Sequence, residues 1–240
     1  MELWTAATPN GWKVTIMMEE LKEAGVELPP IEVHAVDLMA GEQFSDAFTA
    51  RNPNQRIPVL VDGDKNIFES GAILQYLGEK FPSPLFPDDE TRWDILPWVY
   101  WQMANLGPAF GNKLSYTRYM DDIPAEKKEH PLERFSNEAQ RQLRMLDKQL
   151  DGQPYICGDN LTIADIAAWP WVRGWKWSKI NITLHDNVMA WVDRVRTRPG
   201  VERGITYGFP EGELDQWTEE TKKRYASMGS SMASNESLER

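Results

Sequence analysis

Short apolar segments separated by turns fill the first third of the chain, and their spacing predicts a mixture of strands and helices. Residues 3–5 form a first short apolar run, and in residues 31–35 apolar and polar positions alternate, as in a half-buried strand. Between them, apolar residues at helical spacing predict a helix over residues 11–24, which Gly25 closes. A further short helix is predicted over residues 45–50.

The next segment predicts a β-hairpin followed by a helix. Residues 59–61 are consecutive β-formers, the Asp62-Gly63 dipeptide is typical of a hairpin turn, and residues 67–68 are the returning strand. Apolar positions at helical spacing resume after Glu69. A β-α-β unit followed by a hairpin requires a mixed sheet, here of four strands, which is the thioredoxin-like plan.

A proline-rich segment divides the chain, because three prolines fall within residues 81–89 and the strand pattern disappears after them. We therefore predict an α+β thioredoxin-like domain followed by an all-α domain. The expected bounds are 1–81 for the first domain, 82–90 for the linker, 91–208 for the helical domain and 209–240 for a C-terminal extension. The end of this extension is rich in Ser, Met and Asn, a composition typical of disorder.

The second half of the chain shows helical periodicity throughout. A long helical stretch covers residues 91–114, and Pro97 within it should kink or break the helix. Residues 131–150 carry the most regular apolar stripe in the chain, at intervals of three and four. Residues 187–198 predict one more helix, stopped by Pro199.

A capping box marks the start of the helix that we expect to lie at the centre of this domain. Thr162 can cap the N–H of Asp165, and Asp165 can reach back to Thr162. Leu161 and Ile166 can pack together across the helix start as a hydrophobic staple. The following residues are apolar on all sides, so this helix should be buried.

Composition excludes several classes of protein. The chain has 240 residues, of which 41% are hydrophobic, and no apolar run is long enough to span a membrane. A formal charge of -11 disfavours a nucleic-acid partner. The N-terminus lacks a signal-peptide pattern, and the single cysteine, Cys157, fits a reducing compartment, which favours a cytoplasmic location. The sequence contains no metal-spaced Cys/His cluster, so no metal is expected.

The turn between the hairpin and its helix collects groups that could bind an amino acid or a peptide. The backbone of Ile57, just before Pro58, could pair with a peptide as an added strand. Free N–H groups at the helix start beside Ser70 attract anions, and the Glu69 carboxylate can bind an ammonium group. The alternative is an ordinary helix cap and a proline turn.

Several motifs in the chain resemble those of glutathione transferases. The Arg-Ile-Pro and Glu-Ser-Gly-Ala-Ile-Leu segments resemble the glutathione-binding half of that family, in which the proline is cis. The loop Thr8-Pro9-Asn10-Gly11 followed by Lys13 resembles the nu class and the related yeast nitrogen-catabolite regulators. Further matches are Gly41-Glu42-Gln43-Phe44, Trp101-Gln102 with Leu106-Gly107-Pro108, Glu133-Arg134-Phe135, and Ile163-Ala164-Asp165-Ile166-Ala167 with Trp169-Pro170-Trp171.

The resemblance implies the cytosolic glutathione transferase architecture and a glutathione site, with one or two glutathione molecules as co-substrate. Thr8 and Asn10 lie where other transferases carry a Tyr, Ser or Cys. Neither can act as a base at neutral pH, but a hydroxyl or amide N–H donated to the sulfur favours its thiolate. A helix cap is the alternative role for both residues. By position, the expected glutathione-binding residues are Gln43, Arg56, Ile57, Glu69, Ser70 and, facing a second glutathione, Arg134.

The expected function is that of a nu-class glutathione transferase, acting as a glutathione-dependent disulfide reductase with weak conjugating or peroxidase activity. The second substrate would be a small disulfide or electrophile. The alternatives are a regulatory protein that binds glutathione or another ligand without turnover, and, with less support, a structural domain of a translation complex. The aromatic residues between Trp93 and Phe110, together with the two-fold dimers of the family, predict a homodimer. Cys157 reads as a packed residue rather than a nucleophile.

Overall fold

The computed structural model describes residues 1–120 and 123–207 together with Glu220 and Lys223. Apart from those two residues, the predicted C-terminal extension, residues 209–240, lies outside the described residues. Within the described part of the chain, no helix combines the length and the apolar character needed to cross a bilayer.

A four-stranded mixed sheet forms the N-terminal domain. Its strands are β1 (Glu2–Thr5), β2 (Glu32–Ala35), β3 (Val59–Asp62) and β4 (Lys65–Phe68). The strand order is β2-β1-β3-β4, with β1 parallel to β2 and antiparallel to β3, and with β3 antiparallel to β4. The predicted mixed sheet and thioredoxin-like plan are confirmed.

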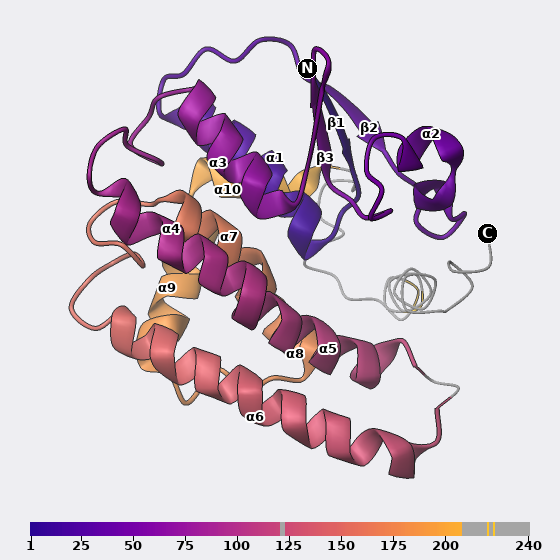
Figure 1. The fold of residues 1–240 in the computed structure, drawn as a ribbon. Coiled ribbons are helices and arrows are strands. Elements are labelled where there is room, and N and C mark those ends of the chain that lie inside the picture. Colours follow the sequence, from indigo (N-terminus) through magenta and orange to yellow (C-terminus); the bar gives the residue numbers. More distant parts are fainter. Residues whose placement is uncertain (121–122, 208–219, 221–222, 224–240) are drawn as a thin grey trace.

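The two faces of the sheet are covered by different elements. Helices α1 (Pro9–Glu23) and α3 (Ser70–Lys80) lie along one side, and the short helices η1 (Glu42–Phe44) and α2 (Asp46–Thr49) lie towards the other (Figure 1). Side chains of a strand alternate between faces. Leu3 accordingly joins the large core with α1 and α3, whereas its neighbour Trp4 packs with Phe48 in a second, smaller cluster.

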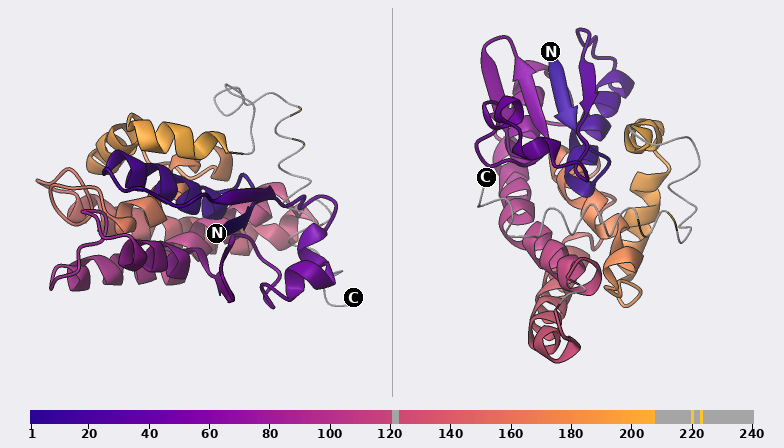
Figure 2. Two further views of the ribbon diagram at one scale, coloured as in Figure 1. Left: turned by 90° about the horizontal axis from the view of Figure 1, so that it is seen from above. Right: turned by 90° about the vertical axis from the view of Figure 1, so that its right-hand side faces the viewer.

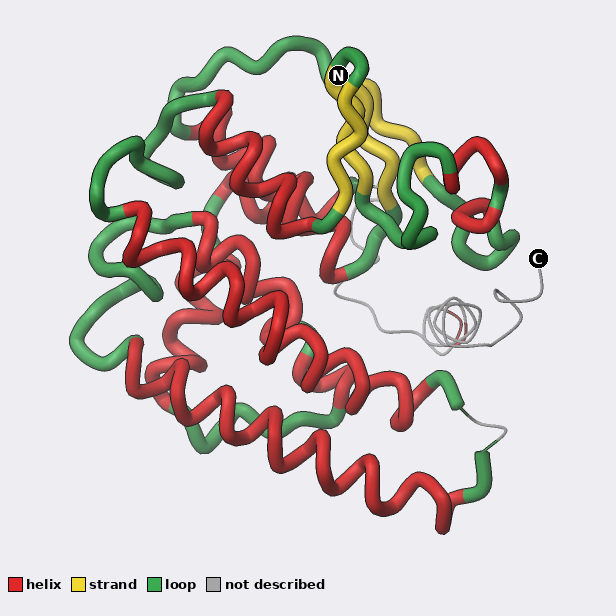
Figure 3. The backbone as a smooth tube through the Cα atoms, viewed as in Figure 1, coloured by secondary structure: helices red, strands yellow, loops and turns green. Residues whose placement is uncertain are grey.

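The rest of the described chain is helical, as Figure 3 shows, and the sheet and α6 lie at opposite ends of the molecule (Figure 2). The all-α second domain is confirmed. Its elements are α4 (Arg92–Trp101), η2 (Gln102–Leu106), α5 (Gly107–Arg118), α6 (Ala125–Gln149), α7 (Ile163–Arg173), α8 (Trp175–Ser178), α9 (Asp186–Arg196) and α10 (Pro199–Thr206).

The first long helix of this domain departs from the prediction at its prolines. Of the predicted kink or break at Pro97, the break is wrong, because α4 continues through this residue. Proline lacks the N–H that would donate to the carbonyl of Trp93. The irregularity instead precedes Pro108. There η2 is a π-helical turn in which the Gly107 N–H donates to the carbonyl of Gln102, and such turns are frequent at functional sites.

Helix α6 begins six residues earlier than predicted, at Ala125, and it contains Pro131 rather than starting there. Pro131 falls in its second turn, where the missing N–H leaves only one carbonyl without a partner. The predicted capping box of α7 is present, with Asp165 accepting from the Thr162 N–H at 3.0 Å. The helix that it starts is buried, as predicted.

Helix α10, which the sequence did not predict, fastens the C-terminal part of the described chain to α1. Pro199 is the first residue of α10 rather than only the end of the preceding helix, a position that proline favours. The Thr15 hydroxyl donates to the carbonyl of Gly204 at 2.6 Å, and Arg198 bonds both carboxylate oxygens of Glu20 at 3.0 and 2.6 Å. Helix α1 is thereby held between the sheet and the helical domain, and its N-terminus carries the Thr8–Asn10 loop.

Candidate active site

A cavity of about 540 Å³ lies where the N-terminus of α1, the loop before β3, the start of α3 and helix α5 meet. Its size is typical of a small-molecule site. The structure brings most of the predicted site residues together around it. Those that line the cavity are Thr8, Asn10, Gln43, Arg56, Ile57, Glu69 and Ser70.

The N-terminus of α1 presents two different polar groups to the cavity, the Thr8 hydroxyl and the Asn10 amide. Thr8 is the N-cap of α1, and its hydroxyl accepts from the Gly11 N–H at 3.3 Å. Asn10 does not cap the helix. Its Oδ1 accepts from the Lys13 ammonium at 2.9 Å and from the Trp171 indole at 3.0 Å. With both acceptor positions of that oxygen used, the Asn10 amide has Nδ2 left as a donor to the cavity.

The loop before β3 shapes the opposite wall. The Ile57–Pro58 peptide bond is cis, as the resemblance implies. Buried Asn52 holds the loop from within, since its Nδ2 donates to the Arg56 carbonyl at 2.6 Å and its Oδ1 accepts from the Asn54 N–H at 2.9 Å. The Ile57 backbone is therefore fixed at the cavity edge, where an extended peptide could pair with it.

The turn into α3 carries Glu69 and Ser70, which are predicted to bind the ammonium and the carboxylate of a ligand. Glu69 is exposed and has a φ of 69°, a strained value for a residue with a side chain. Ser70, the first residue of α3, is buried. Strain of this kind persists where the surrounding structure enforces it, and here it places a carboxylate beside the N–H groups of a helix start.

Gln43 is the most unusual polar residue of the cavity. Its side chain is 1% exposed, and among the described residues neither its Oε1 nor its Nε2 has a hydrogen-bond partner. Most buried side-chain polar atoms have a partner, so an orphaned amide requires an explanation. A polar ligand in the cavity that Gln43 lines would supply one.

Lys13 and Gln102 are site residues whose roles the sequence did not predict. Lys13 lies on α1 and lines the cavity, although it is only 1% exposed. Its ammonium donates to Asn10, to Ser70 Oγ at 3.3 Å and to Gln102 Oε1 at 2.7 Å. Burial lowers the pKa of Lys13 well below its usual value, and attraction to Glu69 opposes that shift. The available signal was a lysine within an almost continuous apolar run of α1.

The far side of the cavity is aromatic, and it comes from α5 and the segment around α8. Tyr119 and Trp177 both line it, with the Trp177 indole donating to the Tyr119 hydroxyl at 3.4 Å. Arg118 lies over the Trp177 ring, 4.4 Å from its centroid. Trp171 lines the cavity between this wall and Asn10. Flat apolar groups could stack against these rings.

Arg134 lies apart from the other predicted residues. It is exposed on α6, in a separate shallow depression with Arg141 and Arg144. The buried stripe of α6 contains Ala139, Leu143 and Leu146, and position 134 is off that stripe. Within a single chain the structure does not bring Arg134 to the cavity, and its contact with a second glutathione stays a prediction.

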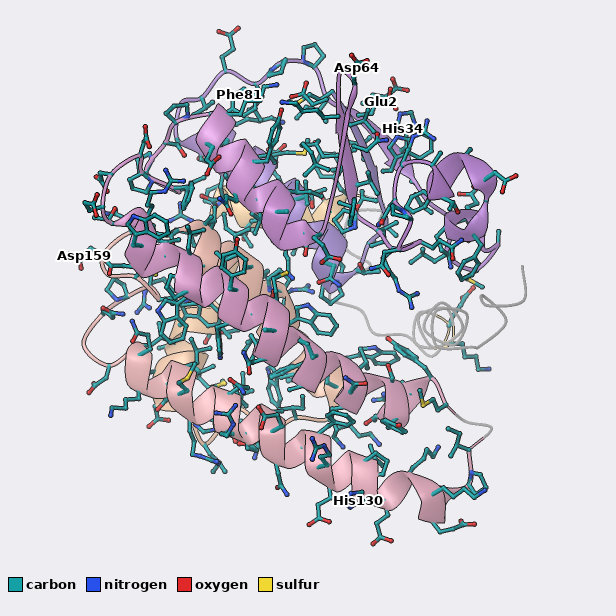
Figure 4. All side chains as sticks on the ribbon, in the orientation of Figure 1. Glu2, His34, Asp64, Phe81, His130 and Asp159 are labelled. Atoms are coloured by element: carbon teal, nitrogen blue, oxygen red, sulfur yellow. The ribbon has the colours of Figure 1, made fainter. Side chains whose placement is uncertain are left out.

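The remaining reactive side chains lie elsewhere. Burial raises the pKa of the Cys157 thiol to about 12, and its sulfur lies 3.6 Å from the Asp94 carbonyl. His34 lies at the sheet and His130 near the start of α6 (Figure 4), while His185 contacts Gln140 at 3.0 Å. Among the described residues, no group of three or more His, Cys, Asp or Glu side chains could hold a metal ion.

A thioredoxin-like domain joined to a helical domain, with a cavity at their junction that has one polar and one aromatic wall, is the architecture of a cytosolic glutathione transferase. Residues 1–79 match the family model of the glutathione S-transferase N-terminal domain, and residues 103–199 match that of its C-terminal domain. The chain belongs to the glutathione S-transferase family, which confirms the resemblance noted from its motifs.

Among the individual relatives with similar sequences are two disulfide-bond oxidoreductases. The disulfide-bond oxidoreductase YfcG of Escherichia coli is 35% identical over an alignment of 212 residues, which covers 85% of this chain and 94% of that protein. The disulfide-bond oxidoreductase YghU of the same organism is 36% identical over an alignment of 230 residues, which covers 90% of this chain and 77% of that protein. A crystal structure of a family member from Pseudomonas fluorescens with two glutathione bound has a TM-score of 0.75 and 35% identity, covering 85% of this chain and 91% of that one.

Proposed function

We propose that this protein is a glutathione-dependent disulfide reductase of the nu-class type. The observation that carries the proposal is the orientation of Asn10. Its Oδ1 accepts from Lys13 and Trp171, so a sulfur in the cavity would meet an amide donor. A donor of this kind favours a thiolate without removing its proton. The similarity to two disulfide-bond oxidoreductases supports the same reaction.

The cavity residues fit glutathione from end to end. The Glu69 carboxylate would bind the ammonium of the γ-glutamyl group, and Ser70 with the N–H groups at the start of α3 would bind its carboxylate. The Ile57 backbone would pair with the cysteinyl peptide group. Gln43, whose amide has no partner among the described residues, and Arg56 would bind the glycine end.

The reaction consumes two glutathione molecules and needs no thiol of the protein. The thiolate of the first attacks one sulfur of the disulfide, the S–S bond breaks, and one thiolate leaves and takes up a proton. The product is a mixed disulfide with glutathione. A second glutathione thiolate attacks the glutathione sulfur of that mixed disulfide, giving oxidised glutathione and the second thiol. The two protons taken up by the products come from the two glutathione thiols.

A homodimer in the cytoplasm completes the proposal. Two large aromatic side chains on α4, Trp93 and Tyr100, are 63% and 60% exposed, and a second copy could cover them. The free thiol of Cys157 and the use of glutathione suit a reducing compartment. Light scattering at micromolar concentration should give the mass of two chains, and a monomeric mass would contradict the dimer.

The proposed function is tested by comparing reactions under one set of conditions. Steady-state reduction of hydroxyethyl disulfide by glutathione should be much faster than conjugation of glutathione to an aromatic electrophile. Calorimetry on the same preparation measures glutathione binding. Binding without turnover of any disulfide would overturn the proposal in favour of a regulatory protein, and faster conjugation would favour a conventional transferase.

A further inference from the structure

Lys13 forms hydrogen bonds to residues at both ends of the proposed glutathione site. The ammonium donates to Asn10 Oδ1 at 2.9 Å, to Ser70 Oγ at 3.3 Å and to Gln102 Oε1 at 2.7 Å. An ammonium has three N–H donors and no acceptor, so all three are used. Asn10 lies at the thiol end of the site and Ser70 at the γ-glutamyl end.

This arrangement fixes the direction of hydrogen bonding at both ligand-facing groups. Asn10 must accept from Lys13 with its oxygen, which turns its Nδ2 towards the cavity. The Ser70 oxygen also accepts from Lys13, so its proton points elsewhere. Its other contact is the sulfur of Met103 at 3.9 Å, a weak acceptor, which leaves the Ser70 hydroxyl able to donate to a ligand. Both groups thus act as donors, as an anionic ligand requires.

Gln102 holds the third bond of Lys13 from the helical domain. Its backbone carbonyl accepts from the Gly107 N–H within the π-helical turn. A Cβ at position 107 would lie 2.8 Å from Gln102 Nε2 and 3.0 Å from its carbonyl oxygen, so glycine leaves the room that the Gln102 amide occupies. The π-helical turn before Pro108 therefore places the Gln102 side-chain amide against Gly107 of α5, with its Oε1 towards Lys13.

We propose that Lys13 is a positioning residue for the thiol chemistry. By donating to the oxygens of Asn10 and Ser70, it orients Asn10 as a hydrogen-bond donor to the thiolate of glutathione and Ser70 as a donor to its γ-glutamyl carboxylate. The inference rests on the proposed function. The three acceptors of Lys13 are neutral, and Glu69 is the charged group that acts on it electrostatically. A positive charge of Lys13 would also stabilise a nearby thiolate.

The test is a pH titration of the glutathione thiol in its complex with the protein, followed by the ultraviolet absorbance of the thiolate. Three variants accompany the wild type. Lys13→Met removes the ammonium, and Gln102→Leu removes its closest acceptor. Thr15→Val is the control, because Thr15 is equally buried on α1 but donates to Gly204 on α10. Thermal unfolding and steady-state kinetics are measured for all four proteins.

Lys13→Met should raise the pKa of the bound thiol by about one unit or more and raise the KM for glutathione about tenfold. Gln102→Leu should shift the thiol pKa in the same direction by less, and it carries the test if Lys13→Met does not fold. Thr15→Val should lower the melting temperature, because it removes the hydrogen bond to Gly204 on α10, and it should leave the thiol pKa unchanged, because that bond does not involve Lys13.

Two failures are distinguishable. If the wild type neither binds glutathione nor lowers the pKa of its thiol, the proposed function falls and the role of Lys13 with it. If the wild type lowers the thiol pKa and Lys13→Met gives the same thiol pKa, the inference alone is overturned. If Lys13→Met does not fold, the same result for Gln102→Leu overturns it. In that case Lys13 is a buried structural lysine.

Discussion

The indole Nε1 of Trp171 donates to Oδ1 of Asn10 at 3.0 Å, although the two residues are 161 positions apart in the chain. Asn10 lies in the first turn of α1, and Trp171 lies on the buried helix α7 of the other domain. The thiol end of the proposed site is therefore held by the helical domain. A rearrangement between the domains would change the site directly.

Trp171→Phe should remove this hydrogen bond while keeping an aromatic ring in most of the space that the indole fills. Asn10 would keep Lys13 as its one donor, and its amide would be less firmly oriented. The loss of one neutral hydrogen bond, about 1 kcal/mol, predicts a reductase rate about fivefold lower. Steady-state reduction of hydroxyethyl disulfide measures it. Trp175→Phe, on α8 outside the cavity lining, is the control and should keep the wild-type rate.

Asn10→Ala and Cys157→Ser together identify the source of the reactive thiol. Asn10→Ala removes the amide donor to the glutathione sulfur and should lower the rate by about ten- to a hundredfold, which corresponds to about 1.5–3 kcal/mol. Cys157→Ser should keep the wild-type rate, because a thiol with a pKa near 12 is not a thiolate at neutral pH. Loss of turnover in Cys157→Ser with retention in Asn10→Ala would mean that the thiol belongs to the protein.

The elements that the sequence predicted correctly depend on neighbouring residues. The hairpin rests on Asp62-Gly63 between two β-forming runs, and the start of α7 rests on the capping box of Thr162 and Asp165. The cavity-lining residues of the thioredoxin-like domain were likewise predicted from short motifs, through the resemblance that these motifs carry. Capping boxes and hairpin turns depend on a few consecutive residues, so they can be recognised without knowledge of the rest of the fold.

The missed features depend on residues far apart in the chain. Lys13 is buried because Gln102, 89 positions away, and Ser70, 57 positions away, accept its hydrogen bonds. The apolar residues around Lys13 on α1 are a local sign of burial, but they do not show which distant groups accept its hydrogen bonds. The π-helical turn was also missed, because the sequence around Pro97 and Pro108 does not show which proline follows an irregular turn. The turn before Pro108 contains Gln102, which accepts a hydrogen bond from Lys13 on a distant helix.

Glu69→Ala should weaken glutathione binding. The ligand's ammonium would lose its carboxylate partner, at a cost of about 1.5–3 kcal/mol, or about ten- to a hundredfold in the dissociation constant. Isothermal calorimetry measures that constant. Glu79→Ala, at the other end of the same helix α3, is the matched control, because Glu79 bonds Arg92 at 2.6 Å and does not line the cavity. Equal affinities for wild type and Glu69→Ala would remove Glu69 from the site.

Gly204→Ala should destabilise the contact between α10 and α1. A Cβ at position 204 would lie 2.6 Å from Cα and 2.8 Å from N of Ile16, and these backbone atoms cannot move aside alone. Overpacking of this kind costs about 1–3 kcal/mol, measurable by urea unfolding. Gly174→Ala is the control, since its Cβ would meet its nearest neighbours at 3.5 and 3.8 Å. An unchanged unfolding midpoint for Gly204→Ala would mean that the helices can separate freely.

Glu19 should make the stability of the same helix pair depend on pH. Its carboxylate accepts from Arg203 Nε at 2.7 Å and from Lys22 Nζ at 2.6 Å. Burial acts to raise the pKa of Glu19, but the hydrogen bonds from Arg203 and Lys22 outweigh it and lower the pKa below its usual value. A carboxyl group whose pKa is lower in the folded state stabilises the fold above its unfolded pKa, and that contribution is lost as the pH falls through the folded pKa.

Glu19→Gln should therefore lower the free energy of unfolding at pH 7 by about 1 kcal/mol. The difference from the wild type should persist at pH 6 and shrink as the pH falls below about 4.3, the usual value for a glutamate. Urea unfolding of both proteins across that range measures it. Glu27→Gln, at an exposed position beyond the end of α1, is the control and should match the wild type at each pH. A difference for Glu19→Gln that stays constant down to pH values where the wild-type carboxylate is protonated would assign its effect to packing rather than to charge.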